Sequence, residues 1–213
     1  MKFEEFRKKY QSWPVIPSAV VIREDQAEYQ VNRNQLSRWV KKGALVPLKK
    51  GMYAFHPDAA AASPEMLYIA NRLYEPSYIS LEYALSLYEL IPEYVPIVTS
   101  VTTRKTMSFK NAVGHFTYQH VVPRAFRGFR QEKQNPGRQV FVAEPEKAVL
   151  DFLYLNASKF REDFAGALTG SFRFQNLETL NPARIAELSP CYENRNLSAM
   201  ADKLTDLIRK EKP

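Results

Sequence analysis

Residues 32–55 read NRNQLSRWVKKGALVPLKKGMYAF and decide the fold of the N-terminal part of the chain. The first half has the start and end signals of a helix. Asn32 suits the N-cap position, Gln35 stands three residues later as in a capping box, and Gly43 is a typical helix terminator. Between them, apolar residues recur at helical spacing: Leu36, Trp39 and Val40. We therefore predict a helix over residues 32–42 with one narrow apolar face.

The second half of this stretch predicts a β-hairpin. Residues 45–48 and 52–55 are mostly apolar and have the length of short strands, and Lys49-Lys50-Gly51 stands between them as a turn. The glycine permits the positive φ that such turns need. The predicted hairpin therefore carries two lysines at its tip.

A capped helix, a glycine and a basic-tipped hairpin in this order are typical of a winged helix-turn-helix. In that arrangement the apolar stripe packs on the domain, and the opposite face of the helix enters the major groove of DNA. Arg33, Asn34 and Arg38 are the candidates for reading bases, because Arg pairs with guanine and Asn with adenine. Lysines of the helix and the hairpin tip are assigned to phosphates. The candidate DNA-binding residues are Arg33, Asn34, Gln35, Ser37, Arg38, Lys41, Lys42, Lys49 and Lys50.

The charge of the chain is unevenly distributed. The net charge is +7, and residues 1–56 hold 11 Lys and Arg against 5 Asp and Glu. Residues 139–213 hold 10 against 11. A basic N-terminal part is typical of proteins that bind a polyanion, because neutralised phosphates supply non-specific affinity. The partner predicted from this pattern is duplex DNA.

The composition disfavours several other classes of protein. The single cysteine, Cys191, excludes an internal disulfide and a cysteine-rich zinc site. No apolar run approaches the roughly 20 residues needed to span a bilayer, and the acidic start lacks the apolar core of a signal peptide. We expect a cytoplasmic protein without membrane contact. No glycine-rich phosphate loop or nucleophile motif is present, so we expect no enzyme, no cofactor and no metal.

The rest of the sequence predicts a second, larger domain. Capping residues and helical periodicity predict further helices over residues 63–73, 81–90, 144–155 and 197–208, with a short one after Asn181-Pro182. Apolar and β-branched runs predict strands over residues 94–103, 114–122 and 138–143. The expected fold is thus α+β, with a winged helix-turn-helix over residues 1–58. A linker near residues 56–62 joins it to an α/β domain over residues 63–213 with a small mixed sheet.

A second basic cluster lies in this larger domain. Its members are Arg124, Arg127, Arg130, Lys133 and Arg138, interleaved with Phe126 and Phe129. Such a cluster can contact flanking DNA, RNA or an acidic protein partner. A solvated loop is the alternative, because Asn135-Pro136-Gly137 is a turn signal.

Three stretches together resemble the AbiEi-type antitoxins, which are transcriptional regulators of bacterial abortive-infection (type IV toxin–antitoxin) systems that act in viral defence. The first is residues 34–54, NQLSRWVKKGALVPLKKGMYA. The others are residues 78–85, YISLEYAL, and residues 142–151, VAEPEKAVLD. The glycine–hairpin–tyrosine pattern is shared by many winged helices, whereas its combination with the later PEKAxLD run is more specific.

The resemblance implies a DNA-binding N-terminal domain and an α/β antitoxin domain. It also implies repression of the chain's own operon at inverted repeats, and a toxin partner that resembles nucleotidyltransferases. Two other functions remain open from the residues themselves. Glu144, Glu146 and Asp151 are the acids of a hypothetical metal-dependent nuclease. A plain transcription factor with a ligand-sensing second domain is the other.

Overall fold

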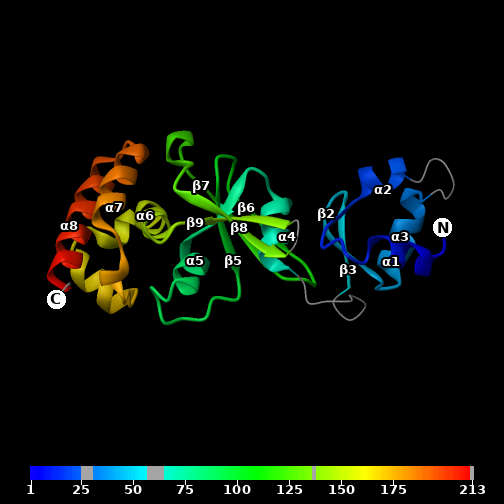
Figure 1. Cartoon of the computed structure of the whole chain (residues 1–213), viewed down its shortest axis with the longest axis horizontal. Helices are drawn as coiled ribbons and strands as arrows, with labels where there is room; N and C mark the ends of the chain where they lie inside the picture. Colours follow the sequence, from blue (N-terminus) through cyan, green and yellow to red (C-terminus); the bar gives the residue numbers. More distant parts are fainter. Residues whose placement is uncertain (25–30, 57–64, 136–137, 212–213) are drawn as a thin grey trace.

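The computed structural model describes residues 1–24, 31–56, 65–135 and 138–211. Figure 1 shows a smaller lobe built from residues up to 56 and a larger lobe from the rest, with the termini at opposite ends of the molecule. The smaller lobe contains α1 (Phe3–Tyr10), β1 (Ile16–Pro17), α2 (Ser18–Glu24), α3 (Arg33–Lys41), β2 (Leu45–Lys49) and β3 (Met52–Phe55). Its three strands pair antiparallel in the order β1-β3-β2.

The helix and the hairpin predicted from residues 32–55 are confirmed. The Asn32 side chain accepts a hydrogen bond from the Gln35 backbone at 3.0 Å, and the Gln35 side chain accepts one from the Asn32 backbone at 3.1 Å. This capping box satisfies two amide donors that a helix start otherwise leaves unpaired. Gly43 and Gly51 have φ values of 68° and 80°, as the helix end and the turn require.

An aromatic cluster holds α1 and α3 against one face of the hairpin. Phe6 is fully buried, and its ring centroid lies 4.6 Å from that of Trp39 and 5.9 Å from that of Phe55. Full burial of such a side chain contributes about 1.5–3 kcal/mol. The buried residues of this aromatic cluster are Phe6, Tyr10, Ile16, Val21, Val31, Leu36, Trp39, Leu45 and Phe55. All of them belong to the smaller lobe, which therefore has a core of its own.

The larger lobe is built around a mixed six-stranded sheet. Its helices are α4 (Met66–Leu73), α5 (Leu81–Leu87), α6 (Pro145–Leu155), α7 (Pro182–Leu188) and α8 (Arg195–Glu211). Its strands are β4 (Ser77–Ile79), β5 (Val98–Thr102), β6 (Met107–Lys110), β7 (His115–His120), β8 (Phe129–Asn135) and β9 (Arg138–Ala143). Short helical turns lie at Pro123–Ala125, Ala157–Phe160, Gly166–Ser171, Leu177–Thr179 and Ser189–Tyr192. The strand order is β6-β7-β5-β4-β9-β8, and the pairs β5–β7 and β4–β9 are parallel. The expected combination of helices with a mixed sheet is confirmed.

Helices cover both faces of the mixed sheet (Figure 1). On the face toward the smaller lobe, α4 packs over alternate strand residues such as Tyr118 and Val142. On the other face, Tyr78 and Ala143 join a larger core with α5, α6, α7 and α8. This alternation is the normal consequence of successive side chains pointing to opposite faces of a strand. Within the described part of the chain, no helix is both long and apolar enough to cross a bilayer.

The hairpin of the smaller lobe is buried on both faces. Leu45 and Phe55 belong to the aromatic cluster, whereas Leu48 and Ala54 belong to the core that lies under α4. Val15 joins them there. The two lobes therefore share the core under α4, and the hairpin is the layer between that shared core and the aromatic cluster of the smaller lobe.

Hydrogen bonds reinforce this contact between the lobes. The Asn111 side chain donates to the Leu48 carbonyl at 3.4 Å. The Arg138 guanidinium donates to the Ser12 carbonyl of the smaller lobe and also pairs with Glu65 beside the start of α4. These contacts hold the hairpin and the preceding segment on the sheet of the larger lobe.

Several elements differ from the prediction. The strands β1, β4, β6 and β8 were not predicted, because they are short or polar and gain their hydrogen bonds from neighbours distant in the sequence. The helix predicted over residues 81–90 ends at Leu87, and the residue before it, Ser80, does not cap it, because the Ser80 hydroxyl donates to Asp151. The predicted linker after His56, the first two residues of the helix predicted over residues 63–73, and the Pro136-Gly137 part of the turn signal lie outside the described residues.

The shared core predicts a large cost for Leu48→Ala. Leu48 is 3% exposed although it lies beside the hairpin tip, so truncation leaves a cavity between the lobes and lowers the free energy of unfolding by about 2–5 kcal/mol. Urea denaturation followed by circular dichroism measures this loss. Leu87→Ala is the matched control, because Leu87 is 49% exposed and its truncation costs about 0.5 kcal/mol or less. Equal losses in the two variants would contradict the shared core.

Candidate nucleic-acid interface

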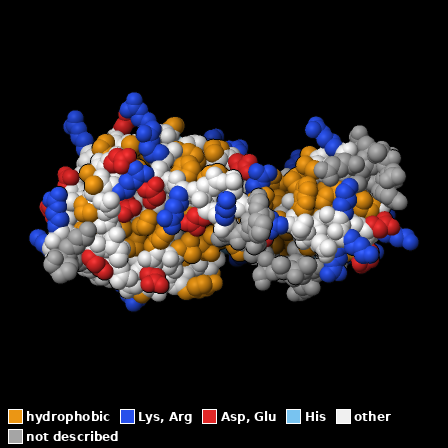
Figure 2. Space-filling view, in the orientation of Figure 1, with side chains coloured by type: hydrophobic (Ala, Val, Ile, Leu, Met, Phe, Trp, Pro, Cys, Tyr) orange, Lys and Arg blue, Asp and Glu red, His pale blue; other side chains and the backbone are white. Residues whose placement is uncertain are grey.

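The helix α3 presents a polar and cationic face to solvent. Leu36 and Trp39 are buried in the aromatic cluster, and Val40 is half-buried. The exposed residues of the opposite face are Arg33, Asn34, Ser37, Arg38, Lys41 and Lys42. Figure 2 shows Lys and Arg side chains on the part of the smaller lobe that lies away from the larger lobe. The sequence placed these six residues on one face, and the structure exposes all of them.

The four cations of this face have no ion-pair partner among the residues that the structure describes. Other surface arginines of the chain do have one; Arg72, for example, pairs with Glu75 at 2.6 Å. Unpaired guanidinium and ammonium groups on one helix face create a local positive potential and keep their donors free for phosphates or bases. We call these six exposed residues, five in α3 and Lys42 directly after it, the α3 face.

Gln35 was predicted to contact DNA, and the structure gives its side chain a different role. Its Oε1 atom accepts the Asn32 amide in the capping box. Its Nε2 atom donates to the Met1 carbonyl at 3.2 Å. Both ends of the side-chain amide are thus occupied within the protein, so Gln35 positions the start of α3 and lies outside the α3 face.

The two lysines of the hairpin tip have different environments. The Lys50 side chain is exposed, as a phosphate contact requires. The Lys49 ammonium instead donates to the Leu73 carbonyl at 2.7 Å, at the end of α4. Burial, followed by the charge of Arg104, lowers the pKa of Lys49 below its ordinary value, although Glu75 opposes this shift. Lys49 therefore links the lobes, and only Lys50 remains available for DNA at the tip.

The second basic cluster is dispersed. Arg124 pairs with Glu193, and Arg130 pairs with Glu132 at 2.9 Å. Arg138 is turned toward the smaller lobe, where it contacts Ser12 and Glu65. Arg127 is exposed and has no ion-pair partner among the described residues. Since three of these four arginines have protein partners, the cluster is not a continuous cationic surface.

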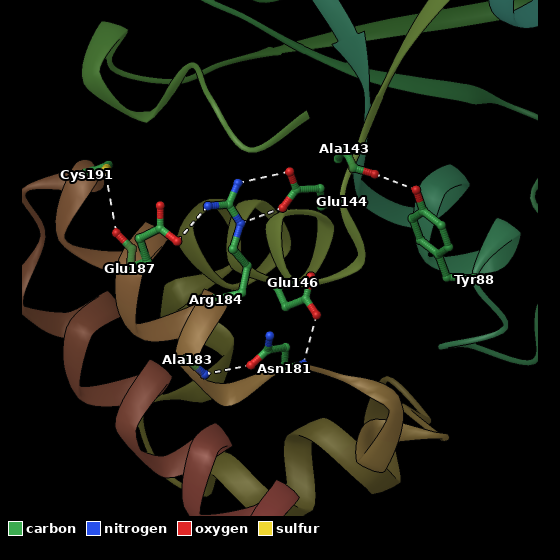
Figure 3. Close-up of polar contacts among 9 residues, drawn as sticks. All are labelled: Tyr88, Ala143, Glu144, Glu146, Asn181, Ala183, Arg184, Glu187 and Cys191. Carbon is green, nitrogen blue, oxygen red and sulfur yellow. Dashed lines mark hydrogen bonds and ion pairs between the residues drawn. The ribbon is translucent and has the colours of Figure 1, made fainter. Parts of the chain in front are cut away.

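Two acids of the hypothetical nuclease site, Glu144 and Glu146, point to separate partners (Figure 3). Glu144 receives two hydrogen bonds from Arg184, at 2.6 and 2.9 Å, and Glu146 accepts the Asn181 amide at 2.8 Å. Asp151 is fully buried. Over the described part of the chain, no group of three or more His, Cys, Asp or Glu side chains is placed to hold a metal ion. The three carboxylates therefore do not converge on one reaction centre.

Asp151 instead organises a buried polar network that the sequence analysis did not find. Its carboxylate accepts hydrogen bonds from Lys147 at 2.7 Å, from Tyr192 at 2.7 Å, from Ser80 at 2.7 Å and from Tyr78 at 2.9 Å. The Lys147 ammonium also donates to the Tyr192 hydroxyl at 2.5 Å. The network ties α6 to β4, to the start of α5 and to the turn before α8.

Burial and the Asp151 charge shift the pKa values of the groups that donate to Asp151. Burial lowers the pKa of Lys147, and the Asp151 charge partly opposes that shift. Burial and the same charge raise the pKa values of Tyr78 and Tyr192 well above their ordinary range, so both remain donors. The sequence held one signal of the network. A helix that is apolar nearly all round cannot bury Lys147 and Asp151 unless they are paired.

The network predicts a large effect of Asp151→Asn. The substitution leaves the buried Lys147 ammonium without its counter-charge, so we expect the free energy of unfolding to fall by about 3–5 kcal/mol. Urea denaturation measures the loss. Glu193→Gln is the control, because it removes the exposed partner of Arg124 and costs about 1 kcal/mol or less. A loss for Asp151→Asn no greater than that of the control would show that the network adds little stability.

Comparison with family models and curated proteins does not assign this chain to a family. The chain matches no model of a known protein family and no curated protein sequence.

Proposed function

We propose that this protein binds duplex DNA through a winged helix-turn-helix formed by its smaller lobe, with α3 as the recognition helix. The observation that carries the proposal is the α3 face. Its four cations have no ion-pair partner among the described residues, and together with two small polar side chains they stand opposite an apolar stripe in which Leu36 and Trp39 are buried. A helix anchored on one side and cationic on the other has the form required for the major groove. The charge excess of residues 1–56 supports the same partner.

Within the α3 face, position along the helix divides the roles. Arg33 and Asn34 stand in the first turn and Arg38 follows one turn later, so these three are proposed to read base edges. Lys41 and Lys42 at the helix end are proposed to bind phosphates together with Lys50. Lys49 and Gln35 are left out of the DNA contact, because protein groups already occupy them.

The biological setting that we propose is that of an autorepressor and antitoxin. It rests on the resemblance of residues 34–54, 78–85 and 142–151 to AbiEi-type antitoxins. In this proposal the DNA is the chain's own promoter with inverted repeats, and the functional partner is a nucleotidyltransferase-like toxin. The larger lobe supplies the antitoxin activity, and the chain itself is not an enzyme.

Arg38→Ala tests base reading by the α3 face. We expect the variant to lose about 1–3 kcal/mol of discrimination between promoter DNA and unrelated DNA, because a bidentate contact to one base is removed. Fluorescence anisotropy with both duplexes measures the two affinities. Arg195→Ala is the control, since this exposed arginine begins α8 at the far end of the molecule. If Arg38→Ala and Arg195→Ala bind both duplexes as the unchanged chain does, α3 is not the recognition helix.

The neighbouring lysines of the hairpin tip give a second test. Lys50→Ala should weaken binding to every duplex about equally and lower the slope of log affinity against log salt by roughly one, because one phosphate contact is lost. Lys49→Ala should leave that slope unchanged, since its ammonium is bound to the Leu73 carbonyl. Titrations at four salt concentrations measure both slopes. If Lys49→Ala lowers the slope and Lys50→Ala leaves it unchanged, the assignment of the phosphate contact to Lys50 is wrong.

A further inference from the structure

The larger lobe contains a cavity that the DNA-binding proposal does not use. Its volume is about 490 Å³, within the range of roughly 300–1,000 Å³ that is common for small-molecule sites. It lies where α4, the start of β4, the segment before β8 and the strand β9 meet. The residues that line it are Tyr68, Asn71, Arg72, Glu75, Pro76, Ser77, Phe126, Phe129, Gln139 and Phe141.

Aromatic rings from three separate segments form much of the wall. Phe126 and Phe129 contact each other edge to face with centroids 5.1 Å apart, and Phe129 meets Phe141 in the same manner at 5.9 Å. Phe141 is 37% exposed and is one of the few large apolar side chains that the described part of the chain leaves open. Tyr68 of α4 completes the wall. Rings arranged in this way favour a flat aromatic guest, which gains offset or edge contacts with them.

The cavity lies beside the place where β4 pairs with β9, since Ser77 of β4 and both Gln139 and Phe141 of β9 line it. The register between the two strands is defined at Ile79 and Val142. Beside that point, the Asn71 side chain takes the place of a strand: its oxygen accepts the Phe141 amide at 2.6 Å, and its nitrogen donates to the Phe141 carbonyl at 3.4 Å. Asn71 thereby provides hydrogen-bond partners for the backbone amide and carbonyl of Phe141 at the edge of the cavity.

One residue that lines the cavity, Ser77, has a buried hydroxyl whose hydrogen-bonding capacity is unused among the described residues. Ser77 is 6% exposed, and its Oγ atom has no hydrogen-bond partner among the described residues. A buried hydroxyl without a partner costs free energy, and a ligand that supplies the partner recovers it. The Gln139 side chain adds a further donor and acceptor to the lining.

The charge around the opening favours an acidic guest. Arg72 and Glu75 form an ion pair at 2.6 Å on the rim, with the Arg72 side chain 45% exposed. Arg104 donates to the Glu75 carbonyl at 3.1 Å, and the Arg138 guanidinium lies 5.9 Å from the Tyr68 ring centroid. Arg138 is itself paired with Glu65, so the described groups around the cavity are three guanidiniums and two carboxylates. This excess of one positive charge favours an anion over a cation.

We propose that this cavity is a binding site for a planar aromatic small molecule that carries an acidic group. The ring lies among Phe126, Phe129 and Phe141, a polar ring atom bonds to the Ser77 hydroxyl, and the acidic group binds Arg72 at the rim. The site stands independently of the DNA-binding function. Two classes of small molecule combine a planar aromatic ring with an acidic group: mononucleotides and aromatic carboxylic acids.

Isothermal titration calorimetry of the full chain tests the site. The probes are AMP, GMP, CMP and UMP in one arm, and indole-3-acetate and salicylate in the other. We expect saturable binding in one arm, which identifies the source of the acidic group. Absence of binding to every probe at about 1 mM, equivalent to a binding free energy weaker than roughly −4 kcal/mol, would overturn the proposal.

Two variants locate the binding. Phe141→Ala should weaken it about tenfold or more, because an aromatic contact is lost, and Arg72→Gln should weaken it about tenfold by removing the anion partner. Both positions are partly exposed, so circular dichroism should show an intact fold. Tyr94→Ala is the matched control, because this aromatic side chain is 88% exposed and lies outside the cavity. Binding that survives both cavity variants unchanged would place the ligand elsewhere and refute the site.

Discussion

The structure depends on a hairpin that is apolar on both faces. One face, with Leu45 and Phe55, completes the aromatic cluster, and the other, with Leu48 and Ala54, completes the core under α4. Because water is excluded from both sides, the hairpin fixes α3 on one side and the larger lobe on the other. Only two side chains of α3, Leu36 and Trp39, are buried. The packing of the hairpin against these two side chains therefore sets the direction in which the α3 face points.

Local signals in the sequence predicted the parts of the fold that local physics determines. Asn32, Gln35 and Gly43 mark the limits of α3 through backbone hydrogen bonding within a few residues, and Gly51 marks the turn. The polar face of α3 followed from the same periodicity. The prediction was correct there because neither the caps nor the apolar stripe needs knowledge of distant residues.

Roles that depend on distant partners could not be predicted. The sequence shows Lys49 and Lys50 as equivalent, and only the position of the Leu73 carbonyl separates them. Arg138 belongs to a run of basic residues, yet its partners Ser12 and Glu65 lie 126 and 73 residues away along the chain. The strand β8 is largely polar, so its composition does not predict a strand; its antiparallel pairing with β9 makes it one. The four donors around Asp151 likewise come from three different segments.

The bond between the Gln35 side chain and the Met1 carbonyl has a practical consequence for experiments. It brings the first residue of this chain to the end of α3 that holds Arg33 and Asn34, whereas the C-terminus lies at the opposite end of the molecule (Figure 1). A purification tag or fluorophore attached ahead of Met1 therefore starts beside the end of α3 that holds these side chains. Labels for surface immobilisation or single-molecule work belong after residue 211, where they leave that helix unobstructed.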